Sequence, residues 1–191
     1  MKFLDNNNIE LERELNELDN FVLDFVKILQ KHTNYVLISG YVALLFGRSR
    51  GTEDVDLFIE KLNEDKFNEL YRDLLKNGFW SINANSAKEL FSMLNDKLAI
   101  RFAKKDDVIP NMEVKFVKDT LDELTMKNRI KVITNDGELF ISKIELQIAY
   151  KRFVLKSEKD LEDALYLQNI FNISEEKVNK YKLLLKENDR L

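Results

Sequence analysis

The sequence predicts an α/β (α+β) fold in which a mixed β-sheet is flanked by helices, with an N-terminal helix and a helical C-terminal part. Short apolar runs rich in β-branched and aromatic residues alternate with segments whose apolar residues recur at helical spacing. The chain has 191 residues, of which 45% are hydrophobic and 34% are charged. These values are typical of one soluble globular domain, here with a small helical appendage. With one proline and five glycines, no flexible linker is expected.

The composition excludes several classes of protein and of site. No cysteine is present, which excludes disulfides, thiolate metal sites and thiol nucleophiles. His32 is the only histidine, so no histidine metal cluster can form. The first residues lack a signal-peptide core, and no apolar run approaches membrane-spanning length. We therefore expect a cytoplasmic protein with no membrane partner. The net charge of −4 gives no overall basic field for nucleic acid, although a local basic patch would suffice.

An apolar stripe predicts the first element, a helix over residues 9–31. Its members recur at spacings of four and three residues: Leu11, Leu15, Leu18, Val22, Phe25 and Leu29. Acidic residues occupy the other faces. A stripe of this kind indicates a helix that packs on its own domain. A short coiled coil, and hence a dimer, is the alternative.

Residues 35–59 are the most informative stretch. They predict a strand over 35–38, a turn, a short helix over 41–46, a basic turn and a second strand that begins at Asp54. Asp54 and Asp56 are two residues apart, with only Val55 between them, so on a strand they point to the same face, about 6.6 Å apart along the chain. Two such carboxylates repel each other, and a divalent cation removes the conflict, because Mg²⁺ prefers carboxylate and phosphate oxygens. A solvated strand end is the alternative for Asp-x-Asp taken alone.

The residues before this pair indicate a phosphate site. Ser39 and Gly40 end the first strand where a helix is predicted to begin, and helix N-termini offer free N–H groups to phosphate. Gly40 permits a close backbone approach and Ser39 adds a hydroxyl donor. Arg48 and Arg50, in the intervening turn, add cations whose geometry matches phosphate. Together with the aspartates, these residues predict a site for a nucleoside triphosphate.

This pattern resembles the signature of the nucleotidyltransferase superfamily, whose fold is shared with DNA polymerase β. A small residue and a glycine are followed, after 9 to 13 residues, by Asp-x-Asp in that signature. Here the thirteen residues 41–53 separate Gly40 from Asp54. The local sequence is most similar to the minimal prokaryotic members, which include abortive-infection nucleotidyltransferase toxins. One departure is the order Ser39-Gly40 in place of Gly-Gly or Gly-Ser, which leaves the role of the hydroxyl open.

The elements that follow are predicted from periodicity and cap signals. Helices are expected over 65–76, from the capping box at residue 86 to 94, over 119–127, from the capping box at residue 142 through 152, over 158–169 and over 175–187. Strands are expected over 79–82, 98–103 and 111–117, and a hairpin over 130–141 with Asp-Gly in its turn. We divide the chain into a core with its N-terminal helix, residues 1–141, and a helical part packed on it, residues 142–191.

The strand over 111–117 alternates strictly, with Glu113 and Lys115 on one face. The resemblance implies a third carboxylate from a strand beside Asp-x-Asp, and Glu113 matches that position by order and context, although the family more often has Asp. It would complete a metal site with Asp54 and Asp56 and accept the proton of an attacking hydroxyl. A Glu113–Lys115 pair facing solvent is the alternative.

The resemblance extends, more diffusely, to about residue 170. A Ser-x-x-Glu-Leu helix start, then Lys151, then a Lys-Asp-x-x-Asp stretch from Lys159 to Asp163 match the family's C-terminal half. Lys151 is therefore a candidate for approaching the triphosphate. Lys159 and Asp163 can equally form a surface ion pair, since they are four residues apart on a helix.

The resemblance implies transfer of a nucleoside monophosphate from a triphosphate to a hydroxyl acceptor, with Mg²⁺ or Mn²⁺ as cofactor. The acceptor classes are RNA such as a tRNA end, a protein hydroxyl, or a small cationic molecule of the aminoglycoside type. The first two fit a toxin–antitoxin or phage-defence component, with an antitoxin as a partner. A member of the same fold that only binds nucleotide or protein is the non-enzymatic alternative.

Overall fold

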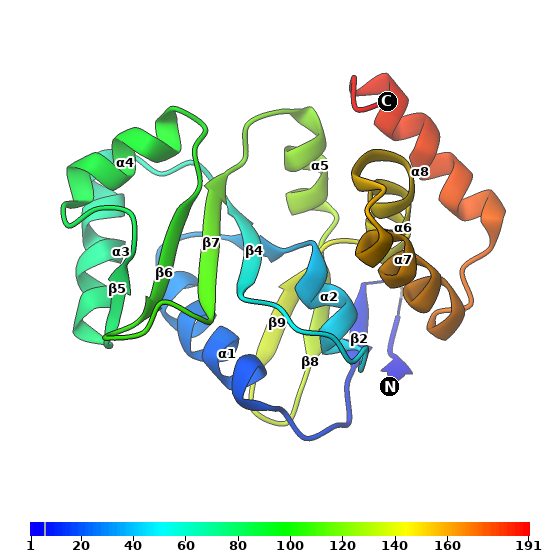
Figure 1. The fold of residues 1–191 in the computed structure, drawn as a ribbon, viewed down its shortest axis with the longest axis horizontal. Coiled ribbons are helices and arrows are strands. Elements are labelled where there is room, and N and C mark those ends of the chain that lie inside the picture. The colour runs from blue at the N-terminus through cyan, green and yellow to red at the C-terminus, as the bar shows by residue number, and fades with distance from the viewer. Residues whose placement is uncertain (6) are drawn as a thin grey trace.

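The computed structural model describes residues 1–5 and 7–191, and in this part of the chain a single mixed sheet organises the fold (Figure 1). Its nine strands lie in the order β1-β2-β8-β9-β3-β4-β7-β6-β5. Their bounds are β1 Lys2–Phe3, β2 Asn8–Glu10, β3 Tyr35–Leu37, β4 Asp54–Ile59, β5 Phe79–Ser81, β6 Ile100–Lys104, β7 Asn111–Phe116, β8 Ile130–Ile133 and β9 Glu138–Ile141. The mixed α/β class predicted from the sequence is confirmed.

Eight α-helices of the described residues surround the sheet. Their bounds are α1 Glu17–Leu29, α2 Gly40–Leu45, α3 Glu64–Lys76, α4 Ala87–Asn95, α5 Thr120–Lys127, α6 Ile144–Tyr150, α7 Glu158–Ile170 and α8 Glu175–Glu187, and a π-helical turn, η1 Lys151–Leu155, follows α6. Figure 1 shows α6, α7 and α8 grouped at the side of the sheet where β2 lies. Within these residues, no helix combines the length and the apolar character needed to cross a bilayer.

The N-terminal helix is shorter than predicted. The expectation of a helix from residue 9 is wrong, because Ile9 lies in β2, which pairs in parallel with β8. The helix begins only after Asn16, whose side chain accepts a hydrogen bond from the Asp19 N–H while the Asp19 carboxylate accepts one from the Asn16 N–H. This reciprocal capping box fixes the start of α1.

The two faces of the central strands have different roles. Val55, Leu57 and Ile59 point to one face of β4 and are fully buried. Helices α1 and α3 pack toward this side, where for example the Phe25 ring lies edge-on to Phe79 with centroids 5.2 Å apart. The opposite face of β4 carries Asp54 and Asp56, which are only partly buried. The alternation predicted for this strand therefore separates the core from the candidate site.

The C-terminal helices share the hydrophobic core of the sheet. Ile148 of α6, Leu167 of α7 and Leu185 of α8 are fully buried in the same cluster as the β4 core residues. The hairpin β8–β9 forms as predicted. The capping box predicted at Ser142 is wrong, because Lys143 precedes the helix and the Ser142 hydroxyl accepts a hydrogen bond from the Gln147 amide instead.

Candidate active site

Parallel pairing of β4 with β7 brings the predicted carboxylates together in register. Asp54 lies opposite Asn111 and Asp56 lies opposite Glu113. Asp54 and Asp56 share one face because they are two residues apart on one strand. Both line a cavity of about 620 Å³, to which Ser39 also contributes. The two aspartates and the turn after β3 are therefore adjacent, as the sequence predicts.

Cations already neutralise Glu113. Lys115 Nζ lies 2.5 Å from Glu113 Oε1 and 3.1 Å from Asp56 Oδ1. Arg101, on the neighbouring strand β6, also forms an ion pair with Glu113. Asp54, in contrast, takes part in none of the ion pairs formed by residues 1–5 and 7–191, and its polar contacts are with Thr52, whose hydroxyl donates to the Asp54 carbonyl oxygen at 2.8 Å.

The environments of the carboxylates shift their pKa values in opposite directions. Burial raises the pKa of Asp56, the Lys115 ammonium opposes this rise, and the charges of Glu113 and Asp54 add to it. Burial also acts to raise the pKa of Glu113, but hydrogen bonds and charge from Lys115 and Arg101 outweigh it, so the pKa of Glu113 is lowered. Asp56 therefore carries its charge at a cost that a cation would relieve.

The donor set fits a divalent cation held by two carboxylates. Across the described residues, no group of three or more acidic or histidine side chains is close enough to hold one ion. The structure thus brings Asp54 and Asp56 to one cavity but does not add Glu113 to them as a third ligand. Mg²⁺ is commonly held by one or two carboxylates and completed by substrate phosphates. The dyad therefore fits the ion, and the ligand role of Glu113 stays a prediction.

The turn at Ser39 and Gly40 is a close crossing of backbone and side chain. A Cβ on Gly40 would overlap the Arg50 guanidinium where it lies, so a larger residue there would require the flexible end of Arg50 to move. Ser39 has φ 63° and ψ −138°, a conformation that is uncommon for a residue with a side chain. The positive φ at Ser39 gives a physical reason why the nucleotidyltransferase signature, which residues 39–56 resemble, has glycine at the position of Ser39.

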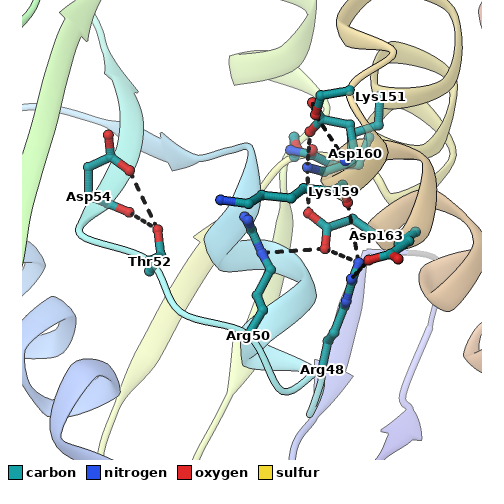
Figure 2. A network of polar contacts seen from close by, with 12 residues as sticks. Arg48, Arg50, Thr52, Asp54, Lys151, Lys159, Asp160 and Asp163 are labelled. Atoms are coloured by element: carbon teal, nitrogen blue, oxygen red, sulfur yellow. Dashed lines mark hydrogen bonds and ion pairs between the residues drawn. The ribbon is translucent and has the colours of Figure 1, made fainter.

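Arg50 and Lys159 supply positive charge to the cavity that contains the dyad. Figure 2 shows both side chains extending into the space on the side that faces Asp54. The Arg50 side chain is mostly buried, its Nε has no hydrogen-bond partner, and it lies 3.4 Å from Asp163 Oδ1. Lys159 belongs to none of the ion pairs found in the described residues. Sequence reasoning did not predict that Lys159 lines this cavity, because its helical spacing from Asp163 also suits a surface pair.

Asp163 is the centre of a buried ion network (Figure 2). Its carboxylate is fully buried and pairs with Arg48 and with Lys151, whose Nζ lies 2.8 Å from Oδ2. Lys151 is itself 1% exposed and also contacts Asp160 at 2.9 Å. The alternative in which Asp163 forms a surface pair with Lys159 is therefore wrong.

Arg48 and Lys151, which the sequence analysis predicts to bind nucleotide, instead form ion pairs with acidic side chains of α7. Arg48 also donates to Glu162 and to the Lys159 carbonyl oxygen. Neither Arg48 nor Lys151 lines the cavity of the dyad. Their contact with a triphosphate stays a prediction, and in this structure either side chain would have to leave Asp163 to make it.

A second cavity of about 310 Å³ adjoins the first and shares Asp56 and Ser39 with it. It lies between the sheet, α5 and α6. Its polar side chains include Lys97, Lys118 and Asp122, and Phe58, Leu121 and Tyr150 are among its apolar and aromatic walls. Sequence reasoning missed this cavity, because its lining comes from segments spread between residues 38 and 155, and no local pattern reveals that they approach one another.

Asp122 is the acidic group of this cavity outside the dyad. Burial raises its pKa, and the nearby Asp119 charge raises it further, while the Lys118 N–H, the Lys118 charge and Arg190 act in the opposite direction. The Asp122 carboxylate accepts a hydrogen bond from the Lys118 N–H at 3.2 Å.

Comparison of the sequence with family models and with curated proteins gives no match. Solved structures do match. An antigenic nucleotidyltransferase-like protein from Paracoccidioides brasiliensis has a TM-score of 0.51 and 16% identity, with 91% of this chain and 90% of that one covered. ANT(2'')-Ia in complex with adenylyl-2''-tobramycin has a TM-score of 0.57 and 12% identity, covering 88% and 96%. A solution structure of the antibiotic-resistance factor ANT(2'')-Ia has a TM-score of 0.53 and 11% identity, covering 88% and 90%. At these identities the likeness establishes a shared fold.

Proposed function

Because this chain has the nucleotidyltransferase fold, we propose that it transfers a nucleoside monophosphate from a nucleoside triphosphate to a hydroxyl acceptor. One observation carries the proposal: the Asp54 and Asp56 carboxylates line a single cavity together with the cations Arg50 and Lys159, and Glu53 lies at the same cavity. Carboxylates that share a face suit a divalent cation, and the nearby cations suit the phosphates that such an ion binds. The fold alone does not imply this chemistry, because one fold hosts many functions.

In this proposal Asp54 and Asp56 hold Mg²⁺ or Mn²⁺, which supplies positive charge to the reacting phosphate when bound. Arg50 and Lys159 bind the β- and γ-phosphates, beside the Ser39 hydroxyl and the Gly40 N–H. The acceptor oxygen attacks the α-phosphorus in line and pyrophosphate leaves. Positioning and charge neutralisation provide most of the rate enhancement in such transfers.

The other predicted residues have indirect or weaker roles in the proposal. Glu113 remains the candidate proton acceptor, although the two cations that lower its pKa also weaken it as a base. Arg48 and Lys151 hold Asp163 and thereby fix α7 against the turn that carries Arg50. We assign them a positioning role.

The direct test is incubation with each α-labelled nucleoside triphosphate and Mg²⁺, together with RNA, protein and aminoglycoside acceptors. We expect label transfer that is lost in Asp54→Asn and Asp56→Asn. Asp65→Asn, which changes an exposed aspartate of α3, is the matched control and should retain transfer. Absence of both transfer and metal-dependent nucleotide binding would refute the proposal. Nucleotide binding without transfer to any acceptor would favour the non-enzymatic alternative.

The charged side chains that line the second cavity indicate which class of acceptor the protein uses. Three lysines, Lys97, Lys115 and Lys118, line it against two carboxylates, Asp56 and Asp122. A polycationic aminoglycoside needs an acidic cleft, and this lining is not predominantly acidic. The charge balance therefore favours a hydroxyl acceptor that carries negative charge, and we propose RNA over an aminoglycoside.

Expression in a bacterial host separates the acceptor classes. Toxicity that Asp54→Ala relieves, with labelled RNA recovered from the cells, would support an RNA acceptor and a toxin role. Aminoglycoside resistance without toxicity would instead support the small-molecule alternative, for which the adenylyl-tobramycin complex of ANT(2'')-Ia is the structural precedent. Label recovered in protein would support a protein hydroxyl.

A further inference from the structure

Lys115 links the dyad to the second cavity. Its Nζ lies 3.1 Å from Asp56 and 2.5 Å from Glu113, and its side chain is 32% exposed. It lines the cavity of about 310 Å³ that Asp56 shares. A lysine ammonium is a compact charge on a flexible stem with three donors. It can therefore change partners over a short distance without a change in the backbone.

The surroundings of Lys115 show which of its two contacts can be given up. Glu113 has a second cation, Arg101, so it stays neutralised if Lys115 moves. Asp56 has no other cation among the described residues, and a buried carboxylate needs a counter-charge. A divalent cation on Asp56 would supply that charge and would repel the ammonium beside it.

We propose that Lys115 is a substrate-binding residue that exchanges partners. In the free protein it neutralises Asp56, and in the loaded protein it contacts a non-bridging oxygen of the α-phosphate at the mouth of the second cavity. This role rests on the nucleotidyl transfer proposed above. It adds a phosphate-binding residue from the second cavity, whereas Arg50 and Lys159 line the first. It also explains why, among the described residues, Asp56 pairs with a cation and Asp54 does not.

The exchange predicts two effects of opposite sign for Lys115→Met. Without nucleotide, the variant should bind Mn²⁺ several-fold more tightly than the wild type, because no ammonium competes for Asp56. With Mn²⁺ present, it should bind an α,β-methylene nucleoside triphosphate about tenfold more weakly, since a charge-assisted contact to phosphate is lost. Titration calorimetry measures both affinities, and the methylene analogue is tested in turn with each of the four common bases.

Arg101→Met is the matched control. Arg101 also pairs with Glu113, yet it lines neither cavity and forms no ion pair with Asp56. We expect both of its affinities to stay within about twofold of the wild type. A purely structural Lys115 would lower both affinities in Lys115→Met or change neither, and either result would overturn the proposal. If the wild type binds no nucleotide, the proposed function itself fails; if it binds and Lys115→Met binds equally well, only the role of Lys115 fails.

A second measurement needs no variant and therefore does not depend on the folding of Lys115→Met. Acetylation of Lys115 by acetic anhydride is followed by mass spectrometry in the wild type. Lys131 of β8, which forms an ion pair with Glu138 of β9, serves as the internal reference. Mn²⁺ alone should raise the reactivity of Lys115, and Mn²⁺ with the methylene analogue should lower it below that of the free protein. Equal reactivity in the three states would contradict the exchange.

Discussion

Asp163 should be the most sensitive polar position in the C-terminal part of the chain. Asp163→Asn preserves the shape of the side chain but removes the charge that faces Lys151 and Arg48. Breaking a buried pair by changing one partner costs about 3–5 kcal/mol, because the other charge is left buried without compensation. Lys151 retains Asp160 at 2.9 Å, so we expect the lower end of that range, about 3 kcal/mol.

Thermal unfolding measures this loss. For a chain of this size each kcal/mol shifts the midpoint by about 2–4 °C, so Asp163→Asn should unfold about 6–12 °C below the wild type. Glu162→Gln is the matched control, since Glu162 also pairs with Arg48 but its side chain is 59% exposed, and exposed pairs contribute at most about 1 kcal/mol.

The double variant Asp163→Asn with Lys151→Met sharpens the test. If uncompensated charge causes the loss, removing Lys151 as well should restore part of the stability, so that the double variant is more stable than the sum of the single changes predicts. Equal small shifts for Asp163→Asn and Glu162→Gln, or simple additivity in the double variant, would refute the assignment of Asp163 as a buried ionic centre.

Three further predictions concern stability. Asn16→Ala should cost about 1 kcal/mol by removing the cap of α1, whereas Asn20→Ala, at an exposed position within the helix, should change the unfolding midpoint little; equal effects would place the helix start elsewhere. Ser39→Gly should raise stability by about 1 kcal/mol by relieving a positive φ, and a loss of stability would show that the hydroxyl matters more than the strain. Burial raises the pKa of Asp122 in the folded state, so its contribution to stability is fully present below its unfolded pKa, about 4, and is lost as pH rises through the folded pKa. The unfolding midpoint of Asp122→Asn should therefore rise relative to that of the wild type as the pH increases above about 4; a pH-independent difference would contradict this sign.

Local patterns predicted much of the fold and the centre of the site. Alternation along β4 and β7 placed Asp54, Asp56 and Glu113 on their faces, because side-chain direction on a strand depends only on residue parity. Serine caps at Ser157 and Ser174 marked the starts of α7 and α8 correctly, because a cap is an interaction over three residues.

The N-terminal boundary failed for a specific reason. The apolar stripe from Leu11 onward suits a helix, but Ile9 and Leu11 are buried by pairing with β8 or beside it, more than a hundred residues later in the chain. The correct start was still visible in the sequence, since Asn16 and Asp19 have the spacing of a capping box. The prediction rested on the apolar periodicity alone, whereas the cap at Asn16 marks where the helix begins.

The partners of the site cations were beyond local reasoning. Lys115 meets Asp56, which lies 59 residues earlier, and Arg48 meets Asp163, which lies 115 residues later. Spacing along one strand or helix could show that Lys115 shares a face with Glu113, but not that strand pairing brings Asp56 within reach. The turn that carries Arg50 is likewise positioned by a helix from the other end of the chain.

Because residues before and after position 141 depend on each other in this way, we predict that residues 1–141 do not fold stably on their own. The fully buried Ile148, Leu167 and Leu185 lie in the same core as the sheet, so a chain of residues 1–141 would expose apolar surface that α6, α7 and α8 normally cover. It would also lack Asp163, leaving Arg48 and Arg50 without their buried partner. We expect residues 1–141 alone to lack a cooperative thermal transition and to bind dyes that recognise exposed apolar surface. The full chain is the control, and adding residues 142–191 as a separate peptide should restore the transition at most in part, because association must then offset the lost entropy. A cooperative transition of residues 1–141 near that of the full chain would show that the core folds without its helices and that the basic turn needs no support from α7.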